Sequence, residues 1–334
     1  MRTEQLAGRA NPADLLVRFA DIETAATRLG AAVHRTPLLR SSSLDAAVGA
    51  RVLSKAEHLQ RSGSFKIRGA LNRMRLLTAD ERERGVVAFS SGNHAQGVAL
   101  AARIEGVSAI IVMPADAPGV KLEATRSYGA QVVCYDRYSQ DRNAVAADIA
   151  ARDGRIVIPP FNDAAVIAGQ GTVGLEAARE CLELGIELEV ALVPVGGGGL
   201  IAGLAIALKA RFPDLRLVGV EPAVADDARR SLAAGRIVTI EQPRTIADGV
   251  ATTAVGTCTF PIMRALVDEI VTVEEASIIR ALRFVMTRMK QVVEPTGALT
   301  TAALLDGAHE YRGATVLSVF CGGNVDPAFL GSIA

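Results

Sequence analysis

The chain has 334 residues, of which 50% are hydrophobic and 22% charged. That composition is typical of one or two well-packed globular domains and excludes a largely disordered chain. The 36 basic and 36 acidic residues balance, so no overall field attracts nucleic acid or an anionic membrane, and any anion must be bound locally. The four cysteines are scattered without a C-x-x-C pair, which argues against zinc and thioredoxin sites and suits a reducing cytoplasm.

The N-terminal stretch carries Glu4, Arg9 and Asp14 and lacks the apolar core of a signal peptide, so we expect a cytoplasmic location. The uncharged stretch 190–208 is long enough to suggest a membrane span. However, Pro194 and four consecutive glycines interrupt it, and a spanning helix would expose unpaired backbone there. The stretch is therefore predicted to be a buried strand, a loop and a helix, with no membrane partner.

Short apolar runs rich in β-branched residues alternate with longer segments of helical period. The runs predicted to be strands are Val86–Phe89, Ala109–Met113, Gln131–Cys134, Arg155–Ile158, Val190–Val195, Leu215–Val220 and Thr315–Phe320. The segments predicted to be helices are Asn93–Ile104, Lys121–Tyr128, Ser139–Arg152, Leu200–Arg211, Ala225–Ala234 and Glu274–Lys290. This alternation predicts an α/β fold built of βαβ units, with mainly parallel sheets flanked by helices.

The alternation is most compact between residues 85 and 161. We expect this segment to form a small domain inserted into a larger one, which would consist of residues 1–84 and 162–334. No Pro/Ser-rich linker marks a boundary, so the two domains should be closely joined. In open α/β sheets ligands bind beyond the carboxyl ends of the strands, so the motifs at strand-to-helix junctions are the candidate sites.

The first motif is EHLQRSGSFKIRGA, residues 57–70, in which Lys66 follows a Ser-Gly-Ser turn and Phe65. A lysine at the start of a helix lies near the positive end of the helix dipole, which disfavours its protonated form. Partial burial would lower its pKa further, as an amine needs to form a Schiff base. On this segment alone an ordinary surface lysine is the commoner interpretation.

The second motif is VAFSSGNHAQG, residues 87–97, in which a buried strand leads into a helix through Ser90, Ser91, Gly92 and Asn93. Small and polar residues beside free helix N–H groups form a cradle that suits a carboxylate. A plain helix cap of Ser and Asn explains the segment equally well. His94 is more often a packed or capping histidine than a catalytic one.

The third motif is VPVGGGGLIAG, residues 193–203, with four glycines between a strand and a helix. Consecutive N–H groups at a helix N-terminus bind phosphate without lysine or arginine. A rival interpretation is the dinucleotide fingerprint, because Gly197, Gly199 and Ala202 match G-x-G-x-x-A and Glu221 follows at the end of the next strand. A second match, at 169–174, lies inside a segment that looks helical and is weaker.

The combination decides between these interpretations. A nicotinamide enzyme leaves the first two motifs unexplained, whereas a pyridoxal-phosphate enzyme uses all three: an amine for the aldehyde, a carboxylate cradle and a phosphate cage. The segment VFCGGN, residues 319–324, adds a small side chain, Cys321, which is able to face a ring nitrogen. Taken alone, Cys321 would be read as a buried core cysteine.

Together, SGSFKIRGA, SSGNHAQG, the tetraglycine loop and CGGN resemble the fold type II pyridoxal-phosphate enzymes, specifically the threonine/serine dehydratase and serine racemase family. The likeness runs in order from about His34 (HRTPLL) through VIAGQGT, VGVEPAVADD, TIADGV and MKQVVEPTGAL to Asn324. It implies a two-lobed enzyme similar to the tryptophan synthase β-subunit, with a large cofactor-binding domain, a small mobile domain and a homodimeric assembly. The cofactor would be pyridoxal 5'-phosphate.

The resemblance also implies roles for particular residues. Lys66 would carry the cofactor and remove the substrate Cα proton, and Ser91 would act on the opposite face. Asn93 would bind the phenolic oxygen of the cofactor, and Cys321 would face its ring nitrogen. The phosphate would be held by Gly196, Gly197, Gly198 and Gly199, and the substrate carboxylate by Ser90, Ser91, Gly92, Asn93 and His94.

A divalent-cation site, usually for Mg²⁺, is implied at Glu221, Asp227 and the carbonyl of Ala225. Two acids and a carbonyl are suitable ligands for a hard cation, although surface acids at a helix start would be the ordinary interpretation. The C-terminal residue follows soon after the CGGN segment, so we expect no regulatory domain of the kind that biosynthetic threonine dehydratases carry.

The activity that this resemblance implies is β-elimination from a hydroxy-amino acid, with L-threonine or L-serine as the leading substrates, giving a 2-oxo acid and ammonia. The uncharged Cys321 favours loss of a β-leaving group over transamination. Serine racemase is an alternative, because racemisation and elimination share an α-carbanion and Ser91 is present. A third possibility is 3-hydroxyaspartate ammonia-lyase, with Arg142 binding the second carboxylate. A non-catalytic amino-acid-binding relative is disfavoured because Lys66 is retained.

Overall fold

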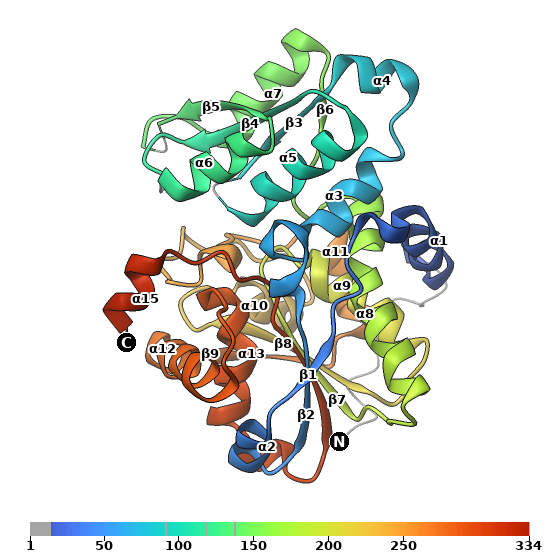
Figure 1. Cartoon of the computed structure of the whole chain (residues 1–334), viewed down its shortest axis with the longest axis vertical. Helices are drawn as coiled ribbons and strands as arrows, with labels where there is room; N and C mark the ends of the chain where they lie inside the picture. The colour runs from blue at the N-terminus through green and yellow to red at the C-terminus, as the bar shows by residue number, and fades with distance from the viewer. Residues whose placement is uncertain (1–14, 91, 118, 137, 334) are drawn as a thin grey trace.

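The strands of the chain gather into two separate sheets (Figure 1). The computed structural model describes residues 15–90, 92–117, 119–136 and 138–333. Within these ranges a six-stranded sheet has the order β1-β2-β10-β7-β8-β9, and a four-stranded sheet has the order β5-β4-β3-β6. In Figure 1 the smaller sheet and its helices form the upper lobe and the larger sheet lies below them.

The larger sheet is parallel except at one edge. Its strands are β1 (Leu38–Arg40), β2 (Arg51–Lys55), β10 (Thr315–Val319), β7 (Val190–Pro194), β8 (Arg216–Pro222) and β9 (Glu269–Val273). β1 pairs with β2 antiparallel, and the other pairings are parallel. Because side chains alternate between the two faces of a strand, Val190 and Leu192 enter one core and Ala191 and Val193 enter the other. Such continuous apolar strands are typical of a sheet covered on both faces.

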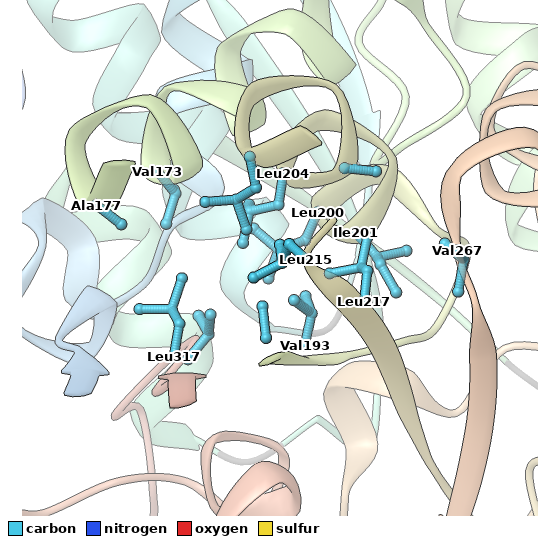
Figure 2. Packing of buried hydrophobic residues seen from close by; sticks show 14 of the residues in the cluster. Val173, Ala177, Val193, Leu200, Ile201, Leu204, Leu215, Leu217, Val267 and Leu317 are labelled. Atoms are coloured by element: carbon cyan, nitrogen blue, oxygen red, sulfur yellow. The ribbon is translucent and has the colours of Figure 1, made fainter. Parts of the chain in front are cut away.

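Two sets of helices cover these faces. One set consists of α1 (Phe19–Leu29), α8 (Ala164–Glu183), α9 (Gly199–Lys209) and α11 (Thr259–Leu266). The other includes α2 (Ser42–Val48), α12 (Glu275–Phe284), α13 (Pro295–Asp306), α14 (Ala308–Tyr311) and α15 (Pro327–Ile333). Figure 2 shows the core beneath the first set, where Val173 and Leu204 pack over Val193, Leu217 and Leu317.

The smaller sheet is parallel throughout. Its strands are β3 (Val86–Phe89), β4 (Ala109–Pro114), β5 (Gln131–Tyr135) and β6 (Ile156–Val157). The helices of this region are α3 (Lys66–Met74), α4 (Ala79–Arg84), α5 (Asn93–Glu105), α6 (Gly119–Ser127) and α7 (Arg142–Asp153). Residues of α3 and α5 share a core with Val86 and Ala88, whereas residues of α7 pack with Val87 and Ile110 on the other face.

The α/β fold with mainly parallel sheets, which the sequence predicts, is confirmed. The seven predicted strands correspond to β3 to β8 and β10, with ends that shift by up to two residues. All strands of the smaller sheet lie between residues 85 and 161, while the exact domain boundaries and the mobility of the small lobe stay predictions. Among the described helices, none combines the length and the apolar surface that crossing a bilayer requires.

All six predicted helices differ from the structure at one or both ends, and three of these differences concern the starts of α7 and α10 (Asp227–Ala234) and the end of α12. α7 begins at Arg142 and not at residue 139, because the Asp141 carboxylate caps it by accepting two backbone N–H groups. The helix predicted from 225 begins at Asp227, which leaves Ala225 in the turn after β8. The segment predicted as one helix from 274 to 290 ends as α-helix at Phe284 and continues as a π-turn over Val285–Met289.

The glycines of α8 explain the weak G-x-G-x-x-G match at 169–174. They lie in the middle of a twenty-residue helix and not at a strand-to-helix junction. A Cβ on Gly169 would lie 2.7 Å from the Arg68 carbonyl oxygen, and one on Gly171 would lie 2.9 Å from the Gly203 carbonyl oxygen. These glycines therefore allow α8 to approach α3 and α9 closely, and they do not form a phosphate loop.

Candidate active site

Lys66 is brought beside Cys321 by pairing between the SGSFK turn and the CGGN loop. Ser64 forms an antiparallel bridge with Gly322, and the Phe65 N–H donates to the Cys321 carbonyl at 3.2 Å. Two motifs that are far apart in the sequence are thus joined by backbone hydrogen bonds. This pairing holds the start of α3, and with it the lysine, at the carboxyl end of β10.

The amine of Lys66 lies in a cavity between the two lobes and donates to the Pro160 carbonyl at 3.0 Å. Burial lowers the pKa of this amine from 10.5 to about 8, and the nearby Cys321 and Glu294 offset only part of that effect. A substantial fraction of the amine is therefore neutral near pH 8. The amine can act there as a nucleophile or as a base.

The tetraglycine loop forms another wall of the cavity, between β7 and α9. Its members are Gly196, Gly197, Gly198 and Gly199, and Gly198 has φ of +89°. A Cβ on Gly197 would collide with the ring of Phe161, and one on Gly198 would lie 2.5 Å from Sδ of Met263. The backbone of the loop is therefore closely packed against Phe161 and Met263, and it lines the cavity at the N-terminus of a buried helix. Such an arrangement binds phosphate through N–H groups.

The third wall is the junction between β3 and α5. The Gly92 N–H donates to Oγ of Ser90 at 3.1 Å, and α5 begins at Asn93. Ser90, Gly92, Asn93 and His94 all line the cavity that contains the Lys66 amine. Ser91, predicted to act on the second face of the substrate, lies outside the described residues.

His94 is buried, and its Nε2 lies 2.8 Å from the Ile158 carbonyl oxygen. Burial and then the charge of Lys66 lower the pKa of the imidazole to about 3. The ring is therefore neutral at physiological pH, and Nε2 carries the proton that the carbonyl accepts. Its Nδ1 has no hydrogen-bond partner within the described residues. A neutral imidazole supplies no positive charge to a substrate carboxylate.

Cys321 is buried and lines the same cavity as the glycine loop. Burial raises the pKa of its thiol well above the ordinary value of 9.0, and the nearby Glu294 adds to this effect. The side chain is thus an uncharged thiol at neutral pH. It can face a ring nitrogen without supplying the negative charge that would keep that nitrogen protonated.

Arg142, the first residue of α7, lines the same cavity as Lys66. Its guanidinium lies 5.8 Å from the ring centroid of Phe89, the last residue of β3. No ion pair joins Arg142 to another residue within the described ranges. A cation at the rim of a cavity that already holds a carboxylate cradle is suited to binding a second anionic group.

Several cavity residues have no role predicted from the sequence. Asp248, Glu294 and Thr296 line the cavity, as does Phe161, whose ring packs against Gly197. Glu294 is buried just before α13 and accepts from the Asn93 amide at 2.6 Å. In the sequence Glu294 is part of MKQVVEPTGAL, where an acid before a helix with proline at its first turn looks like an ordinary exposed cap. Its burial depends on the fold and is not apparent locally.

The predicted cation ligands do not line the main cavity themselves, but Asp227 lies next to Thr252, which does. Glu221, the penultimate residue of β8, accepts from the N–H groups of Ala228 and Arg229 at 3.0 and 2.9 Å. Asp227 is fully buried, and neither of its carboxylate oxygens accepts a hydrogen bond from the part of the chain that the structure describes; the Thr252 hydroxyl faces it without hydrogen-bond geometry.

Burial raises the pKa of Glu221 to about 8 and that of Asp227 to about 7, and each is raised further by neighbouring acids. Two buried carboxylates, of which Asp227 has both oxygens without a hydrogen-bond partner among the described residues, fit a hard cation. Within the described residues, no group of three or more His, Cys, Asp or Glu side chains could hold a metal. A cation here would therefore need a backbone carbonyl, the contribution expected of Ala225.

Residues 30–322 match the profile of a family described as pyridoxal-phosphate dependent enzyme. The chain belongs to this family. Pyridoxal phosphate is accordingly its cofactor, and the two-sheet architecture is that of the fold type II enzymes. The dinucleotide interpretation of the glycine loop is thereby excluded.

Three relatives show how close the similarity is. The chain is 49% identical to L-threo-3-hydroxyaspartate ammonia-lyase from Pseudomonas sp., over 93% of this chain and 96% of the relative. It is 43% identical to serine racemase from Schizosaccharomyces pombe, over 93% and 95% of the two chains. The crystal structure of threonine deaminase from T.th. superposes with a TM-score of 0.89 at 49% identity, over 92% of this chain and 99% of that one.

Proposed function

We propose that this protein is an ammonia-lyase that removes water and ammonia from a hydroxy-amino acid, and that its preferred substrate is L-threo-3-hydroxyaspartate. The observation that carries this preference is the position of Arg142 on the same cavity as Lys66. L-Threonine and L-serine, the leading substrates from the sequence, lack a group for that arginine to bind. The identity of 49% with the Pseudomonas lyase supports the preference, and the same identity to a threonine deaminase makes a direct comparison necessary.

The residues around the cavity fit pyridoxal phosphate. Lys66 would carry it, the N–H groups of residues 196–199 would hold its phosphate, and Asn93 and Cys321 would contact its ring. The close packing behind the glycine loop and the neutral thiol support these assignments. When bound, the cofactor supplies an electron-withdrawing ring that acidifies the substrate Cα proton.

The side chains of the protein then have separate roles in the reaction. The neutral amine of Lys66 takes the proton from Cα, and the carboxylate cradle at Ser90 to Asn93 holds the α-carboxylate so that this C–H bond faces the amine. The β-hydroxyl leaves with its bonding electrons as hydroxide, which becomes water on gaining a proton. Hydrolysis of the resulting enamine gives the 2-oxo acid and ammonia. The thiol of Cys321, being neutral, favours this elimination over transamination.

Arg142 would select among substrates by pairing with the β-carboxylate. The cavity lining contains two cations, Lys66 and Arg142, and two carboxylates, Asp248 and Glu294. A dicarboxylate substrate adds negative charge to this site, which requires a compensating cation near its second carboxylate. Arg142 at the rim meets this requirement, and its stacking on Phe89 orients the guanidinium.

Steady-state assays of the holoenzyme test the proposal. We expect kcat/KM for L-threo-3-hydroxyaspartate to exceed the values for L-threonine and L-serine. Arg142→Ala should lower it by about ten- to a hundredfold, the range for a charge-assisted contact, and leave L-serine nearly unchanged. Arg152→Ala is the matched control, because Arg152 lies at the far end of the same helix and pairs with Asp153. A wild-type preference for L-threonine, or an equal loss on all substrates in Arg142→Ala, would refute the assignment.

Serine racemisation is the second candidate. It is supported by the 43% identity to the S. pombe racemase and by Ser91, the acid/base group expected on the second face. Chiral analysis of L-serine incubated with the holoenzyme decides whether D-serine forms. Ser91→Ala should abolish D-serine formation and spare elimination of L-substrates. Equal loss of both activities would contradict separate roles for the two faces.

We also propose Mg²⁺ as the cation at Glu221, Ala225 and Asp227, a homodimeric assembly and a cytoplasmic location. The buried oxygens of Asp227, which lack hydrogen-bond partners among the described residues, support the proposed cation.

The proposed homodimer rests on the family resemblance, and its test is the molar mass of the holoenzyme by light scattering. The cytoplasmic location rests on the unpaired cysteines, which are all free in the structure.

A further inference from the structure

A chain of hydrogen bonds joins the two lobes at the floor of the active site. Nδ2 of Asn324 donates both to the Ser62 carbonyl and to Oδ1 of Asn93, at 2.8 Å in each case. Nδ2 of Asn93 in turn donates to Oε1 of Glu294 at 2.6 Å. Asn93 begins α5 of the upper lobe, whereas Ser62, Asn324 and Glu294 belong to the segments below it. The Asn93 side chain is thus held from both sides by the large lobe.

The two ends of this chain fix the direction of every bond in it. A backbone carbonyl and a carboxylate only accept hydrogen bonds, whereas an amide side chain has a donor end and an acceptor end. Asn324 must therefore turn its NH₂ group toward the Ser62 carbonyl, which also directs it at Oδ1 of Asn93. Asn93 must turn its own NH₂ group toward Glu294. The Ser62 carbonyl and the Glu294 carboxylate thus fix the orientation of the Asn93 amide. The alternative orientation, with its nitrogen and oxygen exchanged, would not satisfy these two acceptors.

Two glycines leave the space that this arrangement needs. A Cβ on Gly322 would collide with Oε1 of Glu294 and lie 2.9 Å from Nδ2 of Asn93. A Cβ on Gly63 would collide with Oδ1 of Asn324. Gly322 belongs to the CGGN loop and Gly63 to the SGSFK turn, so both motifs that enclose the cofactor site leave room for the same network.

We propose that Glu294 is a positioning residue for the cofactor: it sets the Asn93 amide so that an N–H group, and not the carbonyl oxygen, is available to the phenolic oxygen of pyridoxal phosphate. With Oδ1 bound to Asn324 and one Nδ2 proton on Glu294, the second Nδ2 proton is the group that Asn93 has left to offer. A donor there stabilises the phenolic oxygen in its anionic form. The inference rests on the proposed role of Asn93, and not on which amino acid the enzyme consumes.

Glu294→Gln tests the proposal, because glutamine keeps the shape of the side chain but can present either a donor or an acceptor to Asn93. We expect the variant to bind pyridoxal phosphate about tenfold more weakly, as for loss of one charge-assisted hydrogen bond. Its visible absorption band should also shift in wavelength or in pH dependence. Both are measured without amino-acid substrate, by titrating cofactor into resolved enzyme and recording spectra of the holoenzyme. The proposed substrate preference can therefore fail without affecting this test.

A double-mutant cycle separates positioning from a general structural effect. In an Asn93→Ala background Glu294→Gln should cause no further loss of cofactor affinity, because the group through which Glu294 acts is gone. Glu187→Gln, the same change at an exposed acid, is the control and should bind cofactor like the wild type. An unshifted spectrum and unchanged affinity in Glu294→Gln, or an equal loss in the Asn93→Ala background, would overturn the proposal.

A second variant covers the case in which Glu294→Gln does not fold. Asn324→Asp leaves Glu294 in place and replaces the donor facing Oδ1 of Asn93 by an acceptor, which reverses the preferred orientation at the other end of the network. It should produce the same direction of spectral shift and a weaker affinity. A wild-type spectrum and affinity in Asn324→Asp would also refute the proposal.

Discussion

Arg68, in the first turn of the helix that carries Lys66, forms a fully buried, two-pronged ion pair with Glu57, and both N···O distances are 2.8 Å. Arg68 also donates to Glu176, which in turn accepts from the buried amine of Lys55. Burial opposes both charges, but the attraction outweighs it: the pKa of Glu57 is lowered and that of Arg68 is raised. Since Arg68 lies two residues after Lys66, this pair ties the start of α3 to the large lobe.

Arg68→Leu is predicted to destabilise the protein strongly. It leaves Glu57 buried without its main partner, and breaking a buried pair from one side typically costs about 3–5 kcal/mol. The measurement is the free energy of unfolding in urea at saturating cofactor. Arg35→Ala is the control, since the Arg35–Glu183 pair has side chains 57% and 61% exposed and such pairs contribute less than about 1 kcal/mol. A loss in Arg68→Leu as small as in the control would show that the pair does not stabilise the fold.

The pKa of Lys66 predicts how the enzyme takes up its cofactor. Neutral amine attacks the aldehyde, and burial lowers the pKa of this amine from 10.5 to about 8. The neutral fraction therefore rises with pH, reaches one half near pH 8, and falls about tenfold for each pH unit below that. The rate at which resolved enzyme acquires the visible absorbance of bound pyridoxal phosphate should follow the same curve. Lys66→Ala should show no such absorbance at any pH, and a midpoint near 10.5 would contradict the effect of burial.

The sequence was sufficient to predict the loops that line the active site, but not the buried ion pairs that support them. The tetraglycine loop was recognisable because an uncharged strand, four glycines and an apolar helix follow one another directly. The buried ion-pair cluster of Lys55, Glu57 and Arg68 could not be inferred in this way. Glu176, which accepts hydrogen bonds from both Lys55 and Arg68, is more than a hundred residues away from each of them in the chain, and Glu57 joins the cluster through Arg68. From local sequence patterns, charged residues such as these are expected on the surface. Their buried ion pairs form only when the chain folds.

Helix α8 was recognised only in part, as a segment around 169–174 that looks helical and was given no bounds, for a related reason. Its glycines weaken helix propensity locally, yet they are needed because α8 packs closely against α3 and α9. Strand β2 was also missed, since it begins at Arg51 and ends at Lys55 and so lacks an uncharged run. In both elements tertiary packing outweighs the local signal. Glu294 is the equivalent case within the site, an acid whose burial against Asn93 depends on Gly322.

Gly197→Ala is predicted to weaken cofactor binding by about tenfold or more. The added methyl would collide with the Phe161 ring, and relieving such an overlap typically costs about 1–3 kcal/mol. The shift would displace the N–H groups that are proposed to hold the cofactor phosphate. Titration of resolved enzyme with pyridoxal phosphate measures the loss, and Phe161→Ala in the same background should restore part of it. Gly331→Ala, where a Cβ meets open space, should change nothing; unchanged affinity in Gly197→Ala would show that the loop tolerates displacement.

From the buried carboxylate of Asp227 we predict that a divalent cation stabilises the fold. Burial raises the pKa of Asp227 to about 7 and that of Glu221 to about 8. Within the described residues, no hydrogen bond to the Asp227 oxygens compensates its charge. Bound Mg²⁺ would compensate it, and free cation at about a hundred times its dissociation constant adds about 2.7 kcal/mol to the stability of the folded state. Thermal unfolding in Mg²⁺ and in chelator measures this as a difference in Tm. Asp227→Asn should abolish the difference, whereas Asp226→Asn should retain it because Asp226 pairs with Arg229 and Arg230. A wild-type Tm that responds to neither Mg²⁺ nor Ca²⁺ would contradict a cation site at these two acids.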